Sequence, residues 1–270
     1  MSQPASPSRD GSVTLSRRDL LRLGAASAGA PLIALAPTHP APIEQPAEFN
    51  PQAAPTDLPG EDHPEARART VHNLMLMGLA MRNFALANQG RFPAAAIRKN
   101  GKPLLSWRVA LLPFLDVYHG TRLYQRFRLE ESWDSPHNAP LLKEMPSVFA
   151  PVVPTASAPY STYYQVFVGS GALFEEEEGT RVAEVTDGVA WTLMVVEAAE
   201  PVPWTKPEDL PYDQGKPLPR LGGQFEDGFY VAFADGSARF LSKKIARETL
   251  RALIMRGDRE VITVDQLGPW

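Results

Sequence analysis

The longest hydrophobic pattern in the chain is helical and spans residues 65–89. Its apolar positions step by three and four along one face, and they are Leu74, Met77, Met81 and Phe84. This spacing is typical of an amphipathic helix packed on a core. Gly90 and Pro93 follow as helix stop signals. We therefore predict one helix of about 36 Å, at about 1.5 Å per residue, as the spine of the folded part.

Two shorter helical stretches come next along the chain. Residues 106–115 form an apolar segment that Pro113 interrupts, and residues 122–129 contain Leu123, Tyr124 and Phe127. Both segments are short and rich in large apolar side chains. We expect them to pack on the core within a loop-rich middle region.

The period of the pattern then changes from helical to alternating. Runs rich in Tyr, Val, Phe and Thr predict β-strands at residues 162–168, 191–197 and 229–233. After the last of these, Asp235-Gly236 favours the tight turn of a β-hairpin that returns over residues 237–241.

The end of the chain returns to a helical pattern. Ser242 is the expected N-cap of a helix that runs to Ile254, and residues 261–264 are a candidate for a short last strand. Helices around an alternating centre predict an α+β fold.

The first 63 residues differ in composition from the rest. Arg17 and Arg18 stand in the run Ser-Arg-Arg-Asp-Leu-Leu, ahead of an uncharged stretch rich in Ala, Gly and Leu. This order of parts predicts a twin-arginine signal peptide over residues 1–36, with cleavage between Ala36 and Ala41. Residues 37–63 are rich in Pro and predict an extended linker.

The signal predicts export by the twin-arginine translocase, to the periplasm, the cell surface or the medium. Its uncharged stretch falls short of the roughly 20 apolar residues that span a bilayer, so we expect no stable membrane span after cleavage. An uncleaved anchor and a short amphipathic surface helix are the alternatives. The folded domain then covers residues 64–267.

Composition excludes several classes of function. The 270 residues include no cysteine, which rules out disulfides, thiolate metal sites, cysteine nucleophiles and a lipoprotein anchor. Basic and acidic residues number 27 and 31, for a net charge of -4, so nucleic acid is not an expected partner. No glycine-rich phosphate loop is present in the sequence, and no cofactor is expected.

The densest polar cluster is the run 133–138, which contains Asp134, Ser135 and His137. A hydrolase or a metalloenzyme centred on His137 is one hypothesis, with His119 as a further ligand. The competing interpretation is a turn, in which Asp134 or Ser135 accepts hydrogen bonds from backbone amides at the start of the next helix. The turn is favoured, because members of a catalytic triad normally come from separate elements of a fold.

Two tryptophans stand in loop-like sequence beside Pro, Asp and Ser. Trp133 and Trp204, with His137, are a candidate binding surface, which fits the alternative of an extracellular carbohydrate- or polymer-binding module if the rings are exposed in a row. Pinning a loop to the core is the commoner role for such rings and is favoured for both. The acidic run 175–178 raises a hypothesis of calcium binding, against the commoner solvated loop.

Several short strings occur together in a specific order. They are Asn73-Leu74, Gly78-Leu79-Ala80, Gly90-Arg91-Phe92-Pro93, Leu105-Ser106-Trp107-Arg108, Leu111-Leu112-Pro113, Trp133-Asp134-Ser135-Pro136-His137-Asn138, Thr186-Asp187-Gly188, Val195-Val196-Glu197 and Ala232-Phe233-Ala234-Asp235-Gly236-Ser237. The combination resembles the bacterial domain-of-unknown-function 1559 family, pseudopilin-like proteins related to the major pseudopilin of type II secretion. The resemblance extends over residues 63–267.

The resemblance implies a pilin-like α+β fold, with a long N-terminal helix packed on an antiparallel sheet and a loop-rich middle. Family members usually begin with a prepilin leader and an apolar stem. Here the twin-arginine signal and the linker take that place, so assembly through stacked stems is not expected. Many members also have a histidine ten positions before the final Asp-Gly, where this chain has Phe225.

The resemblance supplies no catalytic residue. The expected function is therefore an exported, non-catalytic structural or binding protein, whose partner is an extracytoplasmic protein or polymer.

Overall fold

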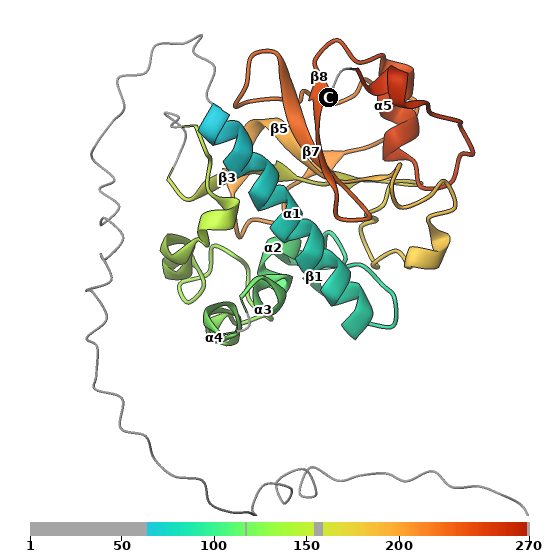
Figure 1. The fold of residues 1–270 in the computed structure, drawn as a ribbon. Helices are drawn as coiled ribbons and strands as arrows, with labels where there is room; N and C mark the ends of the chain where they lie inside the picture. Colours follow the sequence, from blue (N-terminus) through green and yellow to red (C-terminus); the bar gives the residue numbers. More distant parts are fainter. Residues whose placement is uncertain (1–63, 117, 154–158, 269–270) are drawn as a thin grey trace, which may run out of the picture. The chain divides into compact units, whose positions relative to one another are not determined.

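The computed structural model describes residues 64–116, 118–153 and 159–268 (Figure 1). The predicted signal peptide with Arg17 and Arg18, its cleavage region and the linker lie outside these residues and stay predictions. In chain order the elements are α1 (Pro64–Ala87), β1 (Ala96–Lys99), β2 (Lys102–Ser106), α2 (Trp107–Ala110), α3 (Leu112–Leu115), α4 (His119–Arg126), η2 (Ala139–Glu144), η3 (Ser147–Phe149), β3 (Ser161–Gln165), β4 (Phe167–Val168), η4 (Val182–Glu184), β5 (Leu193–Pro203), β6 (Leu210–Pro211), β7 (Gly228–Phe233), β8 (Ala238–Ser242), α5 (Arg247–Ile254) and η5 (Val264–Leu267).

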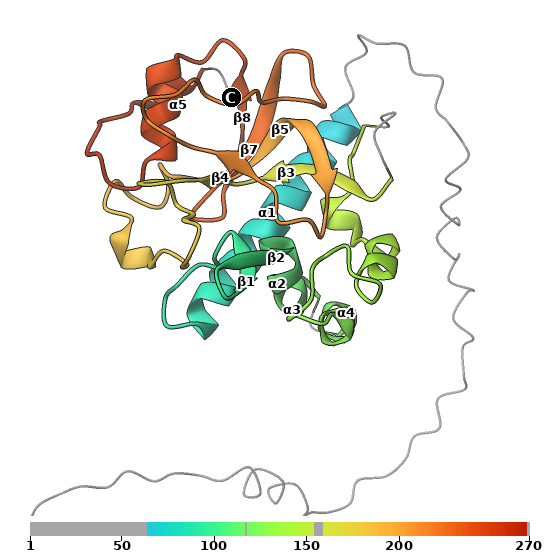
Figure 2. The ribbon, with the colours of Figure 1, turned by 180° about the vertical axis from the view of Figure 1, so that it is seen from behind.

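The central sheet has four antiparallel strands in the order β3-β5-β7-β8. A separate antiparallel pair joins β1 to β2, and a short parallel pair joins β4 to β6. Figure 2 shows the sheet from the side opposite to α1. The α+β class and the three strands expected from alternation are confirmed.

Helix α1 crosses one face of the central sheet and contacts β5, β7 and β8 (Figure 1). On the side of α1 that faces the sheet, Leu74, Met77 and Met81 are fully buried, as their spacing predicts. Gly90, with a φ of 77°, donates its N–H to the carbonyl of Ala85 at 2.8 Å and ends the helix. The long helix, its apolar inner face and its stop signal therefore follow from local sequence.

Two glycines set how closely α1 approaches the sheet. A Cβ placed on Gly78 would lie 2.8 Å from the Cα of Gly236, in the turn between β7 and β8. Gly236 itself has a φ of 88°, which favours glycine. Two of the sequence motifs that resemble the family therefore contact each other in the fold: the motif around Gly78 on α1 packs against the Asp235-Gly236 turn.

The β1–β2 hairpin was not expected from the sequence. It turns at Asn100-Gly101, and both residues have positive φ, 51° and 74°. Asn-Gly between two short strands is the usual signal for a two-residue hairpin turn. The signal was present, but the flanking strands are only four and five residues long and contain no clear alternation.

The interruption predicted at Pro113 is confirmed, since the segment 106–115 forms two short helices, α2 and α3, with Pro113 in the first turn of the second. Two other expectations are wrong in detail. Helix α5 begins at Arg247, and the Ser242 hydroxyl instead accepts a hydrogen bond from the Lys244 N–H at 3.1 Å in the preceding turn. Residues 261–264 form no strand, and the 3₁₀ helix η5 begins there at Val264.

Candidate functional site

The polar run 133–138 is a structural turn. The Ser135 hydroxyl accepts a hydrogen bond from the Asn138 N–H at 3.1 Å, at the start of η2. The side chain of Asn138 is fully buried and bonds to the backbone of Arg128 through both its oxygen and its nitrogen, at 3.0 Å each. It also donates to the carbonyls of Glu131 and Ser132, both at 3.1 Å. The interpretation as turn chemistry holds for Ser135, and Asn138 fixes the loop.

His137 lies at the end of a helix. Its Nε2 is 2.9 Å from the carbonyl oxygen of Arg126, the last residue of α4. A ring N–H at this position donates to that carbonyl and caps the C-terminus of the helix. His119, the other proposed ligand, instead pairs with Asp116 at the surface, Nδ1 to Oδ2 at 3.1 Å. Among the described residues, no three His, Asp or Glu side chains group as a metal site.

Trp204 is not on the surface, so the alternative of an exposed row of rings is wrong and the favoured role of pinning a loop to the core is confirmed for this ring. Its exposed fraction is 0%, and its ring stacks on Phe149 with centroids 5.9 Å apart. The indole N–H donates to the carbonyl of Leu142 at 2.8 Å. Trp133 is half-buried and packs against the same cluster, with the Lys206 ammonium 5.8 Å from its ring. Both rings hold the loop-rich middle to the core.

The acidic run 175–178 is held by arginines. Three of its carboxylates form ion pairs with arginines from separate segments, and these pairs are Glu175–Arg256 (2.6 Å), Glu176–Arg98 (3.6 Å) and Glu178–Arg91 (3.4 Å). A calcium loop needs oxygen ligands that converge on one point. These side chains diverge to different partners, which fits a solvated loop tied at several points.

A buried ion pair joins α2 to the segment before β6. The Arg108 side chain is fully buried, and its Nη2 lies 2.9 Å from Oδ1 of Asp209. The same oxygen accepts hydrogen bonds from the Trp107 indole at 3.1 Å and the Val166 N–H at 3.0 Å. Burial raises the pKa of Asp209 to about 6, against the opposing effect of Arg108. Because every contact is internal, this pair is part of the core.

A second buried carboxyl lies between the sheet and α1. Glu197 on β5 accepts hydrogen bonds from the Gln224 side-chain amide at 2.8 Å and the Tyr230 N–H at 2.7 Å. Burial raises its pKa to about 7. The pKa of the nearby Tyr164 is also raised, mainly by burial and secondly by the negative charge of Glu197. The positive charge of Arg67 on α1 acts in the opposite direction on Glu197.

Sequence reasoning did not identify either carboxyl as buried. Glu197 does belong to one of the resemblance strings, Val195-Val196-Glu197, where an acid ends an apolar run. That position on a central strand was the available signal. Titratable groups with shifted pKa values often mark active sites, but Glu197 and Asp209 line neither the surface hollow at the end of α1 nor the one beside Tyr212 and Met255.

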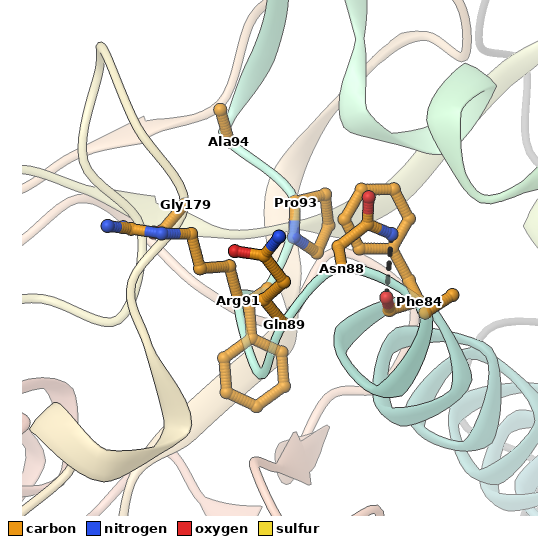
Figure 3. Close-up of a pocket in the computed structure, with 9 residues that line it drawn as sticks. Phe84, Asn88, Gln89, Arg91, Pro93, Ala94 and Gly179 are labelled. Atoms are coloured by element: carbon orange, nitrogen blue, oxygen red, sulfur yellow. Dashed lines mark hydrogen bonds between the residues drawn. The ribbon is translucent and has the colours of Figure 1, made fainter. Parts of the chain in front are cut away.

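Two surface hollows in the described part of the chain contain little reactive chemistry. Figure 3 shows one of about 430 Å³ at the end of α1, lined by Phe84, Asn88, Arg91, Pro93 and Gly179 among others. Two of its polar side chains are already engaged: the Asn88 amide donates to the Phe84 carbonyl at 2.7 Å, and Arg91 donates to the Gly179 carbonyl at 2.9 Å. A second hollow of about 480 Å³, beside Tyr212 and Met255, includes one acid, Asp213.

A group of exposed apolar side chains lies on the outer side of α1. Among the described residues, four of the nine exposed large apolar side chains belong to this helix: Met75 (52% exposed), Leu76 (38%), Leu79 (55%) and Leu86 (81%). His72, Arg82 and Asn83 are also exposed beside them. These seven positions are called the outer face of α1 below. The helix is thus apolar on two sides, one buried on the sheet and one in water, and it is the candidate interaction site.

Within the described part of the chain, no helix has the length and apolar character needed to cross a bilayer. Residues 65–167 match the family described as Protein of unknown function (DUF1559). The resemblance to the DUF1559 family is thereby confirmed over this segment, which runs from α1 to β4, and the relation to pseudopilins stays a prediction. No curated protein and no solved structure matches the chain.

Proposed function

We propose that this chain, a DUF1559 protein over residues 65–167, is an exported, non-catalytic structural or binding protein of pseudopilin-like type. It works in the periplasm or at the cell surface through the outer face of α1. No cofactor takes part in this proposal.

The observation that carries the proposal is the contrast between internal polar groups and the exposed apolar helix. The side chains best suited to chemistry, namely His137, Glu197 and Asp209, each bond to groups that hold the fold together. The four apolar side chains of the outer face, namely Met75, Leu76, Leu79 and Leu86, have no such internal role, because they are exposed to water. Exposed contiguous apolar surface usually marks an interaction site.

The arrangement of α1 supports the pilin-like part of the proposal. One long helix at the start of the domain packs its inner face on an antiparallel sheet, and a loop-rich middle with short helices lies beside it (Figure 1). That order and packing are what the family resemblance implies. Export rests on the Arg17-Arg18 signature alone.

Export is tested by cell fractionation of a bacterium that has the twin-arginine pathway. We expect the parent chain outside the cytoplasm, and the double variant Arg17→Lys, Arg18→Lys retained inside it. Arg22→Lys, four residues after the pair, is the matched control and should be exported like the parent. Equal export of the double variant would show that the twin-arginine interpretation is incorrect.

The structural part is tested by electron microscopy and sizing of the exported protein. We expect discrete small species, because the sequence predicts a twin-arginine signal and a linker where relatives have the apolar stem that stacks in pilus-like assemblies. Filaments in the purified sample would contradict this expectation.

A further inference from the structure

We propose that the outer face of α1 binds a second copy of this chain, as an antiparallel pair of α1 helices with Leu79 at the two-fold axis. The inference deepens the proposed function by naming the partner of the face, and it does not depend on export. It rests on the spacing, the symmetry, the charge and the area of the exposed positions.

The spacing on the outer face is that of a helix-pairing seam. His72, Leu76, Leu79, Asn83 and Leu86 follow one another at intervals of four, three, four and three residues, and all five are exposed. This alternation keeps one side of a helix facing a partner helix over its whole length. A polar residue such as Asn83 within an apolar seam favours one register.

The exposed positions are also symmetric about Leu79. Residues 72 and 86 lie seven positions on either side of it, residues 75 and 83 lie four, and residues 76 and 82 lie three. A two-fold antiparallel pair brings each position against its mirror position on the other copy. Leu79 then meets Leu79 of the second copy, and each Leu86 packs over His72. An interface of this kind is self-complementary, as a closed dimer requires.

Charge permits this pairing. Arg82 donates from Nη1 to the carbonyl of Asp235 at 2.8 Å, so its charged group is held toward the β7–β8 turn and its aliphatic stem remains at the seam. In the antiparallel register Arg69 lies opposite Gln89 and Arg82 lies opposite Leu76. Within α1, no residue has a mirror position of like charge.

The exposed area is of the size that a small dimer uses. The four apolar side chains leave roughly 400 Å² in water, about the size of the largest apolar patch on a typical monomer. With the flanking polar residues and the 24-residue length of α1, a helix pair approaches roughly 600 Å² per partner, the lower end for specific dimers.

A membrane surface is the other chemistry that an apolar helix face fits, and the structure favours it less. Interfacial helices use several lysines or arginines around the apolar side to bind anionic lipid. Here Arg82 is tied to the Asp235 carbonyl, which leaves Arg69 and His72 as the basic groups beside the face. The chain as a whole has a net charge of -4.

The arrangement is tested by disulfide cross-linking of the full chain, which has no native cysteine to interfere. Leu79→Cys should cross-link to itself under brief mild oxidation, because the two positions meet at the axis. Leu86→Cys alone should not, since its two copies lie roughly 21 Å apart along the helices at about 1.5 Å per residue. A mixture of His72→Cys and Leu86→Cys should give the cross-linked product.

Sedimentation of the full chain gives an independent measurement. We expect a concentration-dependent dimer for the parent and a dissociation constant at least tenfold weaker for Leu79→Glu, which places two carboxylates at the axis. Val261→Glu is the matched control, because Val261 is an apolar residue exposed to 84% outside α1, and it should dimerise like the parent. Circular dichroism checks that both variants keep the fold.

Three outcomes would overturn the proposal. They are a parent protein that stays monomeric at all concentrations, self-cross-linking of Leu86→Cys as efficient as that of Leu79→Cys, and a monomer that binds anionic phospholipid vesicles through Leu79. Each of these outcomes leaves the export test unaffected, so failure of the dimer and failure of the proposed function are distinguishable.

Discussion

The buried carboxyl of Glu197 makes stability depend on pH in a direction that the structure fixes. Burial raises its pKa to about 7, from the ordinary value of 4.5 for a glutamate. A group whose pKa is raised on folding stabilises the folded state below the unfolded pKa and loses that contribution as pH rises through the folded pKa. The free energy of unfolding should therefore fall between about pH 4.5 and pH 7 as far as this group is concerned.

The magnitude follows from the shift. About 2.5 pKa units at about 1.4 kcal/mol each give about 3 kcal/mol. Replacing Glu197 with Gln removes the titration and keeps the shape. The amide has a single acceptor oxygen for the two donors, Gln224 and Tyr230, which costs about 1 kcal/mol at every pH. The variant should thus be less stable than the parent at pH 4.5 and more stable at pH 8.5.

The assay is urea unfolding of parent and variant from pH 4.5 to pH 8.5. The difference between the two free energies of unfolding should change by about 3 kcal/mol across this range. Taking the difference removes the contributions of Asp209 and of other groups that titrate in both proteins. Glu200→Gln, exposed on the same strand, is the control and should keep the pH dependence of the parent. A flat difference for Glu197→Gln would refute the reasoning.

Two further substitutions test the packing of the domain. Gly78→Ala should destabilise the fold by about 1–3 kcal/mol, because its Cβ would lie 2.8 Å from the backbone of Gly236. Thermal unfolding measures this loss. The control is Ala68→Gly on the exposed side of α1, which should cost no more than about 1 kcal/mol. Asp209→Asn should destabilise by about 3–5 kcal/mol at pH 8, because it leaves the Arg108 charge buried without its counter-charge. Chemical unfolding measures the second effect, and a loss below about 1 kcal/mol would mean that water reaches the guanidinium in the folded state.

Local sequence was sufficient for the regular elements of this fold. The spacing of Leu74, Met77 and Met81 identified α1 and its buried side, and Gly90 identified its end. Alternation located β3, β5 and β7, and Asp235-Gly236 located the turn after β7. These features depend on backbone geometry and on the period of one face, both of which neighbouring residues determine.

Tertiary structure decided what each polar or aromatic group does. A tryptophan between prolines and polar residues has the same local pattern whether it is exposed or stacked on Phe149, so the sequence favoured the burial of Trp204 without identifying the ring that it packs on. The fate of Glu197 and Asp209 depended on segments far along the chain that exclude water around them. Tertiary structure also decided which side of α1 is buried, because the sequence of this helix is apolar on two sides. A single sheet covers only one side of a helix, so Leu79 and Leu86 on the other side stay exposed to water.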